Sequence, residues 1–349
     1  MSKYSEIAEV LRKEIEQGKY EKAGKLPTEF ELVDRFGVSR QTIRQAISTL
    51  KAMNIVHQVQ GSGTYINDPR ARGRAPESVF KNIFVICTYI SEYIFPSIIR
   101  GIDSTLNGTG YRFNLAATGN KVDVERKILT DIIRLRECDG IIVEGSKTGF
   151  PNPNIALYKQ ITDIGIPMVF LHCSYQELPE AVVVGMDDRA GGKIAVKKLI
   201  DAGCRKIMGF FKSDDRQGLL RYAGFSDGVI ESGLGLENTE LRWYTTEDMV
   251  DQRLNLDSAL LNHITDAGID GIVCYNDLVA GAILQGMMNA GKKAPRIISF
   301  DRSIISNNGI LTFESLGHQK ENLGIVAAEK IRNMVEGKKE TSVFLPWID

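Results

Sequence analysis

Residues 26–44 read LPTEFELVDRFGVSRQTIR, and this stretch decides the fold of the N-terminal part of the chain. Thr28 and Glu31 are spaced as a capping box, in which each side chain accepts a hydrogen bond from the other residue's backbone N–H at the start of a helix. Gly37 is placed to end that helix, and Ser39 is placed to cap the next one. Two helices joined by a short turn that contains glycine predict a helix-turn-helix.

The flanking sequence extends this motif on both sides. Residues 4–17 carry apolar side chains at helical spacing, which predicts a first helix. Residues 55–60 alternate like a strand, residues 61–63 can form a turn, and residues 64–66 return as a second strand. The sequence therefore predicts a winged helix over residues 1–67.

The first turns of the third predicted helix carry polar side chains, which lie off its apolar face. Arg40, Gln41 and Arg44 are among them, and Arg and Gln pair in bidentate fashion with the edges of guanine and adenine. The N-terminus of a recognition helix faces the major groove, where Thr42 and backbone N–H groups can contact phosphate. Taken alone, Arg40 and Arg44 would also fit solvated surface charges. Their place in a helix-turn-helix favours contact with double-stranded DNA.

Charge is divided unevenly along the chain. The 349 residues include 43 Lys and Arg against 44 Asp and Glu, a net charge of −1. Residues 1–75 hold 13 basic and 9 acidic residues, whereas the remainder holds 30 and 35. A basic N-terminal segment followed by an acidic remainder is consistent with a nucleic-acid-binding module joined to a second module. Residues 68–81 contain Pro, Gly and Arg without apolar periodicity, which predicts a linker between the two.

Residues 3–66 resemble the winged helix of the gluconate-repressor (GntR) family of bacterial regulators. The resemblance is carried by Leu26-Pro27-Thr28-Glu29, Phe36-Gly37-Val38-Ser39-Arg40, Thr42-Ile43-Arg44 and Gly61-Ser62-Gly63-Thr64-Tyr65. In that family the arginines of the recognition helix enter the major groove and the glycine at the wing tip reaches the minor groove. The resemblance implies that the DNA contacts are made by Lys3, Arg40, Gln41, Thr42, Arg44, Gln60 and Gly61.

From residue 82 onward, strand-like and helix-like segments alternate. The predicted strands are 82–89, 111–117, 140–144, 166–172, 182–186, 206–211, 269–275 and 297–300, and the predicted helices are 95–106, 123–136, 188–202, 217–232 and 277–289. Such alternation predicts parallel sheets with helices on both faces. The run Asp139-Gly140-Ile141-Ile142-Val143 recurs as Asp270-Gly271-Ile272-Val273-Cys274. We therefore expect two similar lobes, with a ligand between them at the carboxyl ends of the strands.

Polar and aromatic residues follow several of these strand ends. A sugar requires planar donors and acceptors for its hydroxyl groups and an aromatic face for its C–H side. Candidates placed to supply these contacts are Tyr93, Phe95, Glu144, His172, Asp214, Asn276 and Asp301. Nearby Asp187, Asp188 and Asp277 could equally cap helices, and His172 could be a strand-end residue without a ligand.

Residues 82–340 resemble the lactose-repressor and periplasmic sugar-binding family. The resemblance is carried by Ile98-Ile99-Arg100-Gly101-Ile102, Arg221-Tyr222-Ala223-Gly224-Phe225, Tyr275-Asn276-Asp277 and Phe300-Asp301. It implies an α/β two-lobed periplasmic-binding-protein-like domain over residues 82–349 that binds an effector and dimerises. It also implies that Arg221, Asn276 and Asp301 bind sugar hydroxyls.

A GntR-type head on this kind of sensor is an unusual pairing, and it is similar to the arabinose-repressor group of bacterial regulators. Residues 89–101, 143–144, 212–218 and 274–277 favour that group. The resemblance implies a homodimeric repressor that binds a double-stranded DNA operator and is released from it by L-arabinose. A regulator of the same architecture that senses another sugar, a sugar phosphate or a nucleobase remains open, with Arg100 or Lys212 available for a phosphate.

Common enzyme and cofactor motifs are missing from the sequence. It has no Gly-x-Ser-x-Gly, no Walker loop, no His-Glu-x-x-His and no metal-spaced His or Cys set. We therefore expect no metal or cofactor, and an enzyme on a two-lobed α/β scaffold is only a distant alternative. The five cysteines form no Cys-x-x-Cys pair and are expected to be reduced thiols. Since no apolar run reaches about 18 residues and the N-terminus does not resemble a signal peptide, we expect a cytoplasmic protein without membrane contact.

Overall fold

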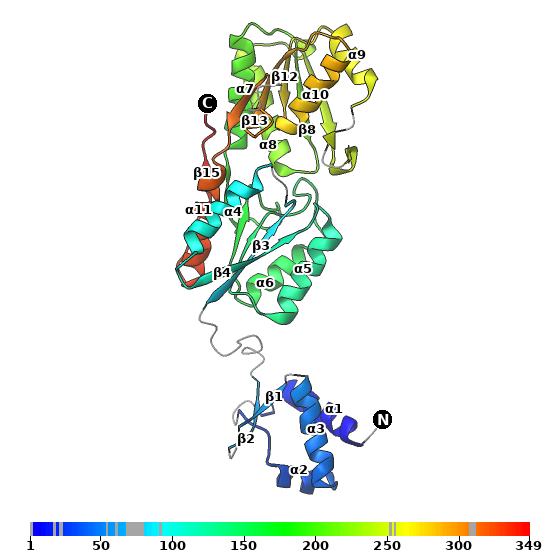
Figure 1. The fold of residues 1–349 in the computed structure, drawn as a ribbon, viewed down its shortest axis with the longest axis vertical. Coiled ribbons are helices and arrows are strands. Elements are labelled where there is room, and N and C mark those ends of the chain that lie inside the picture. The colour runs from blue at the N-terminus through cyan, green and yellow to red at the C-terminus, as the bar shows by residue number, and fades with distance from the viewer. Residues whose placement is uncertain are drawn as a thin grey trace. The chain divides into compact units, whose positions relative to one another are not determined.

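The computed structural model of the chain divides into two compact units, one formed mainly by residues 1–78 and the other by nearly all of the rest. It describes residues 3–16, 19–20, 24–53, 55–59, 62–67, 80–90, 93–250, 253–254, 256–306 and 312–349. Figure 1 labels the helices and strands of both units. Among these residues, no helix combines the length and the apolar character needed to cross a membrane.

The first unit is a winged helix. Its elements are α1 (Lys3–Glu16), α2 (Glu29–Phe36), α3 (Arg40–Ala52) and the antiparallel hairpin of β1 (Val56–Val59) and β2 (Gly63–Ile66). Both predicted caps are confirmed, because Thr28 and Glu31 form the capping box and Oγ of Ser39 accepts from the N–H of Thr42 at 3.2 Å. Gly37 ends α2 in the left-handed conformation, with φ of 61°, which suits a residue without Cβ. The predicted linker lies outside the described residues up to residue 79, and residue 81 already begins a strand.

Two parallel sheets form the second unit. Their strands are β3 (Lys81–Cys87), β4 (Tyr111–Ala117), β5 (Gly140–Val143), β6 (Met168–Leu171), β7 (Val182–Met186), β8 (Ile207–Lys212), β9 (Thr239–Tyr244), β12 (Gly271–Cys274), β13 (Arg296–Asp301), β14 (Glu314–Gly317) and β15 (Val343–Leu345). The first sheet has the order β15-β7-β6-β5-β3-β4 and the second has the order β14-β13-β12-β8-β9. In each sheet the first strand in the chain lies between the second and the third, so the two lobes repeat one topology. A separate short pair, β10 (Met249–Val250) and β11 (Arg253–Leu254), follows β9.

The repeated sequence run has the same role in both lobes. Asp139 precedes β5, and its carboxylate accepts from the backbone N–H of Asn82 at 2.7 Å. Asp270 precedes β12, and its carboxylate accepts from the N–H groups of Arg205 and Lys206 at 2.8 and 2.9 Å. In each lobe, therefore, an aspartate before the third strand holds the start of the first strand. The expectation of two similar lobes is confirmed.

Helices cover both faces of each sheet. They are α4 (Phe95–Leu106), α5 (Val122–Leu135), α6 (Ile155–Asp163), α7 (Asp188–Asp201), α8 (Arg216–Ser232), α9 (Ser258–Asp266), α10 (Asp277–Asn289) and α11 (Lys320–Val335), with short 3₁₀ turns at Leu236–Asn238 and Thr246–Asp248. Figure 1 shows α4 and α11 on one side of the first sheet and α5 and α6 on the other. Side chains alternate accordingly along β3, where Ile83 and Val85 join the α4 and α11 core and Ile86 joins the α5 and α6 core.

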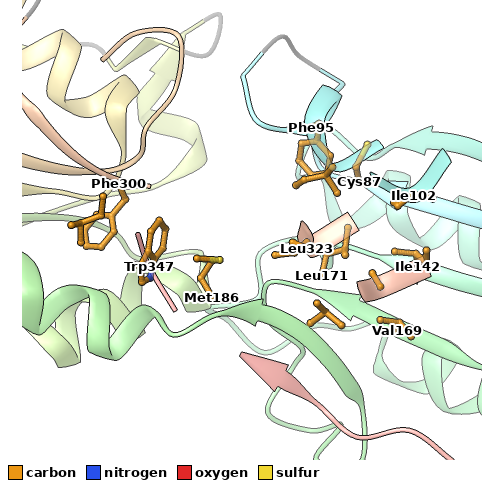
Figure 2. Close-up of a cluster of buried hydrophobic side chains, with 14 of the residues drawn as sticks. Cys87, Phe95, Ile102, Ile142, Val169, Leu171, Met186, Phe300, Leu323 and Trp347 are labelled. Atoms are coloured by element: carbon orange, nitrogen blue, oxygen red, sulfur yellow. The ribbon is translucent and has the colours of Figure 1, made fainter. Parts of the chain in front are cut away.

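One hydrophobic cluster continues from the first lobe into the second. Figure 2 shows Phe300, Trp347 and Met186 at one end of it, and Phe95 and Leu323 toward the other. The chain passes between the lobes from β7 to α7, from β14 to α11, and after β15, where the tail bridges back to the end of β14. Three neighbouring connections of this kind form a hinge about which two lobes can rotate as rigid bodies.

Candidate DNA-contact surface and effector cavity

The start of α3 presents the predicted DNA-contact side chains to solvent. Arg40, Gln41 and Arg44 are exposed, whereas Ile43 and Ile47 of the same helix are buried in the core. The polar and apolar faces of α3 therefore separate as its sequence predicts. Such an exposed basic face at a helix N-terminus is what a recognition helix needs to enter the major groove.

Glu29 on α2 holds both arginines of this surface. Its Oε2 accepts from Nε of Arg40 at 2.8 Å, and its Oε1 accepts from Nε of Arg44 at 3.3 Å. The Glu29 side chain is 18% exposed, against 55% for Arg40 and 66% for Arg44. One carboxylate at the start of α2 thus orients two solvent-facing guanidinium groups of α3.

The other predicted DNA contacts are less closely grouped in the structure. Thr42 is half-buried, and its hydroxyl lies 2.8 Å from Oγ of the capping Ser39. Lys3 is exposed at the first residue of α1. Gln60 and Gly61, which the sequence predicts at the wing, lie outside the described residues.

In the second unit, a cavity of about 370 Å³ lies between the lobes. The residues that line it lie at the carboxyl ends of β3, β4 and β5 in the first lobe and of β8, β9, β12 and β13 in the second, which is where α/β sheets bind ligands. The predicted effector residues that line it are Tyr93, Phe95, Glu144, Arg221, Asn276 and Asp301. His172 and Asp214 lie outside this lining.

Arg221 is the most enclosed charge of the cavity. Its side chain is 2% exposed, its Nε donates to Oδ1 of Asp188 at 2.8 Å, and its Nη1 donates to the carbonyl of Tyr275. Asp301 lies 3.9 Å from its Nη2. The guanidinium carbon is also within 5 Å of three ring centres, at 4.8 Å from Tyr275, 4.6 Å from Phe300 and 4.9 Å from Trp347. Carboxylates at the edge and aromatic faces above the plane fix its orientation.

Asp301 and Tyr93 join the two lobes across the cavity. The hydroxyl of Tyr93 donates to Oδ2 of Asp301 at 2.6 Å and accepts from the N–H of Asp277 at 3.2 Å. Asp301 has a φ of 95°, in the left-handed region that a residue with Cβ rarely adopts. Burial raises the pKa of Asp301 above its ordinary value, although the Arg221 charge opposes this shift. Such local strain at a strand end accompanies a ligand site more often than a purely structural one.

Asn276 combines a structural and a binding position. It lines the cavity, and its Oδ1 accepts from the N–H of Val279 at 3.2 Å as the N-cap of α10. Because the oxygen caps the helix, the amide nitrogen is the atom that can donate to a ligand. The neighbouring Asp277 points into the protein, where it accepts hydrogen bonds from Ser303, Ser306 and Ser315.

Glu144 lies at the first-lobe side of the cavity. Its Oε2 accepts from the backbone N–H of Thr88 at 2.7 Å and also from the Thr88 hydroxyl. Burial raises the pKa of Glu144 to about 7, although these hydrogen bonds oppose the shift. The charge of Asp215 raises this pKa further, and that of Lys212 lowers it. At neutral pH the group therefore exchanges between a donor and an acceptor form.

Replacing Glu144 by glutamine is expected to change how stability depends on pH. Because folding raises the pKa of Glu144 from 4.5 to about 7, the folded protein holds this proton more tightly than the unfolded chain. The contribution of the group to stability is greatest below its unfolded pKa and falls as the pH rises through the folded pKa. Glutamine stays uncharged throughout, so Glu144→Gln gains stability relative to the unmodified protein between about pH 5 and about pH 8. Thermal unfolding across this range checks the result, and a constant difference contradicts it.

His172 lies beside the cavity rather than in it. It lines a smaller space of about 20 Å³ that shares Glu144, Lys212 and Asp215 with the main cavity. Within the described residues neither of its ring nitrogens has a hydrogen-bond partner, and burial lowers its pKa to about 4, so the ring is neutral. The ring packs edge-on against Phe95 and His318.

Asp214 acts on the cavity through a neighbour. It is fully buried, and its Oδ2 accepts from the backbone N–H of Thr246 at 3.0 Å. Thr246 lines the cavity, and its Oγ1 accepts from Nδ2 of Asn120 at 2.6 Å. Asn120 belongs to the first lobe, so this chain of contacts is a second link between the lobes, besides that of Tyr93 and Asp301.

Several lining residues were not among the predicted site residues. They include Thr88, Asn120, Lys212, Asp215 and Tyr275. Asp215 accepts from the Tyr275 hydroxyl at 2.5 Å and from the Gln217 N–H at 3.1 Å. The sequence offers Lys212 only as a contact for a phosphate, and Asp215 and Tyr275 lie in the polar runs 212–218 and 274–277, so the pattern indicated their segments but not these two residues. Nothing in the sequence pattern marked Thr88 or Asn120.

Comparison with known proteins finds a matching family for each of the two units. Residues 3–66 match the model for bacterial regulatory proteins of the gntR family, and residues 81–349 match that for periplasmic binding proteins and the sugar-binding domain of the LacI family. The chain belongs to the family of bacterial repressors that join these two domains. An arabinose metabolism transcriptional repressor of Halalkalibacterium halodurans is 35% identical, covering 97% of this chain and 91% of that protein. One of Geobacillus stearothermophilus is 32% identical, covering 96% and 92%.

Solved structures support the fold of the sensor of this repressor. A LacI family transcriptional regulator from Enterococcus faecium with bound ribose has a TM-score of 0.63 and 20% identity, covering 76% of this chain and 96% of that one. The transcription regulator CcpA of Lactococcus lactis has a TM-score of 0.64 and 24% identity, covering 76% and 95%. The two matched domains, together with the two relatives that match nearly the full chain, identify the protein as a DNA-binding, sugar-responsive transcriptional repressor.

Proposed function

We propose that this repressor binds its operator in the absence of sugar and is released by L-arabinose. The observation that carries the proposal is the cavity between the lobes, where Arg221, Asn276 and Asp301 offer planar polar groups beside the aromatic rings of Tyr93 and Phe95. This is the combination that a sugar requires. Two relatives that match nearly the full chain are arabinose metabolism repressors, which supports L-arabinose among the sugars.

A neutral sugar fits the charges of the cavity better than a sugar phosphate. The two buried cations of the lining are already engaged, since Arg221 pairs with Asp188 and Nζ of Lys212 lies 3.7 Å from Asp214, whereas the third cation, Lys121, is exposed to solvent. A phosphate would have to compete with these carboxylates for either buried cation, at a cost in desolvation. A polyol hydroxyl can instead share the existing donors and acceptors.

The proposed mechanism is a shift between two arrangements of the lobes. A sugar that contacts Glu144 in the first lobe and Arg221 or Asn276 in the second stabilises the closed arrangement, and an open one lacks half of these contacts. Residues 82–349 would also dimerise, which would hold two winged helices of residues 1–67 on a two-fold operator. Closure would alter the spacing of the two heads and weaken operator binding, by binding alone and without catalysis.

A thermal-shift screen with matched sugars tests the sensing step. L-arabinose, D-xylose, D-ribose, D-glucose and the corresponding phosphates would each be added to the full-length chain. A ligand at about 100 times its dissociation constant stabilises the folded state by about 2.7 kcal/mol, so L-arabinose is expected to raise the melting temperature and the phosphates are not. A shift with another sugar and none with L-arabinose would assign a different effector. If no compound shifts the midpoint, the sensing role is wrong.

A further inference from the structure

An exposed phenylalanine lies beside the recognition helix. Phe30, the second residue of α2, is 70% exposed. Its ring contacts Arg40, whose guanidinium carbon lies 5.0 Å from the ring centre. This is the distance at which a cation is attracted to an aromatic face.

Phe30 and Glu29 hold Arg40 from two directions. The Glu29 carboxylate accepts from Nε at 2.8 Å, and the guanidinium carbon lies over the Phe30 ring. The described hydrogen bonds of Arg40 and Arg44 both use Nε, so the terminal amino groups are the ones that can donate to O6 and N7 of a guanine. The carboxylate therefore restricts the position of each arginine without taking the atoms that read a base.

Arg40 needs such restraint more than a buried arginine does. Its side chain is 55% exposed, and a free arginine has many rotamers that must be given up on binding. If the side chain is restrained before binding, it loses less conformational entropy on binding. This gain matters where the arginine must adopt one geometry, as it must on a base edge. Contact with phosphate tolerates many geometries and gains little from it. In addition, a cation–π contact strengthens when DNA displaces the surrounding water.

We infer that Phe30 is a positioning residue that sets the preference of Arg40 for guanine in the operator. This inference rests on the proposed function, in which the exposed face of α3 reads an operator. The ring acts through Arg40 and is not itself required for general affinity for DNA. Loss of the ring should therefore reduce discrimination between sequences and leave non-specific binding unchanged.

The test uses DNA selected by the full-length chain from a library of random duplexes. Each guanine of this duplex is replaced in turn by 7-deazaguanine. The guanine that Arg40 contacts is the one whose replacement weakens binding of the unmodified protein but not of Arg40→Ala. Phe30→Leu keeps an apolar side chain but removes the aromatic face, and it is expected to weaken binding to the selected duplex by about 5- to 30-fold. Its affinity for poly(dI-dC) should not change, and Phe30→Tyr should retain the affinity of the unmodified protein.

A double-mutant cycle and a distant control separate this role from a structural one. In the Arg40→Ala background, Phe30→Leu should have no further effect, because the partner of the ring is gone. Met53→Leu is the control, since Met53 is 57% exposed about 20 Å along α3 from Arg40 and should leave both affinities unchanged. An equal loss on selected and non-specific DNA, or a further loss in the Arg40→Ala background, would overturn the inference. If the unmodified chain enriches no duplex at all, operator binding itself is wrong.

Discussion

Arg44→Ala is expected to weaken binding to a selected operator duplex by about 30-fold or more. A bidentate contact between arginine and guanine contributes about 1–3 kcal/mol of discrimination, and the proposed dimer would lose two such contacts. The Arg44 side chain is 66% exposed and contributes nothing to the core of the winged helix. Folding should therefore be unaffected, and Glu29 keeps Arg40 as its partner.

Fluorescence anisotropy with labelled duplexes measures this loss, and Lys51→Ala provides the matched control. Lys51 is also an exposed basic residue of α3, but it lies in the last turn. The control should change affinity only slightly, as expected for a charge that contacts phosphate or solvent. Equal losses in both variants would mean that net charge, rather than the position of Arg44, governs binding. The thermal shift with L-arabinose should survive in Arg44→Ala, because the effector cavity lies in the other unit.

Arg221→Met is expected to abolish the response to sugar and to destabilise the protein by about 3–5 kcal/mol. Removing one partner of a buried ion pair leaves the other charge without compensation, and here both Asp188 and Asp301 lose their cation. Methionine keeps an apolar side chain against the rings of Tyr275 and Phe300. The loss of stability therefore measures the contribution of the Arg221 charge and its hydrogen bonds. Such a variant should remain bound to the operator when L-arabinose is added.

The destabilisation by Arg221→Met should grow with pH. Burial raises the pKa of Asp188 to about 6, and the charge of Arg221 opposes that shift. Without Arg221 the folded-state pKa of Asp188 rises further, so the folded variant favours the protonated carboxyl. Its stability is then greatest at low pH and falls as the pH rises through that raised pKa, which makes the loss larger at about pH 8 than at about pH 5.

Thermal unfolding at both pH values, with and without L-arabinose, checks these expectations. Arg189→Met is the control, because Arg189 forms a surface ion pair with Asp227 on the neighbouring helix. An exposed pair of this kind contributes little to stability, so this variant should melt near the unmodified protein and keep the sugar shift. A normal L-arabinose shift in Arg221→Met would remove Arg221 from the proposed binding site.

Features that depend on close neighbours in the chain were accessible from the sequence. The capping box of Thr28 and Glu31 and the cap of Ser39 span three residues each, and both are present. The helices at Phe95–Leu106 and Asp277–Asn289 have the predicted bounds, and the first carries Pro96 in its first turn while Asn276 caps the second. The alternation of strands and helices likewise predicted parallel sheets.

Elements without such local preferences were missed. β9, β14 and β15 are short or lie at sheet edges, and β15 pairs with β7 at Leu345 and Met186, far apart in the chain. Helix α11 begins after Gln319, which makes no side-chain cap. Whether such a segment becomes regular structure depends on the surface that receives it.

The sequence by itself determined the two modules, the exposed basic face of the third helix and the segments that line the cavity, because these depend on residue types and spacings within a few positions. Only the tertiary structure decided which polar residues share the cavity. Asp214 and Asp215 are neighbours, yet the first turns to the backbone of Thr246 and the second to the cavity. Tyr93 and Asp301, which close the cavity together, are 208 residues apart. Contacts over that distance arise from the packing of two lobes and leave no pattern in the local sequence.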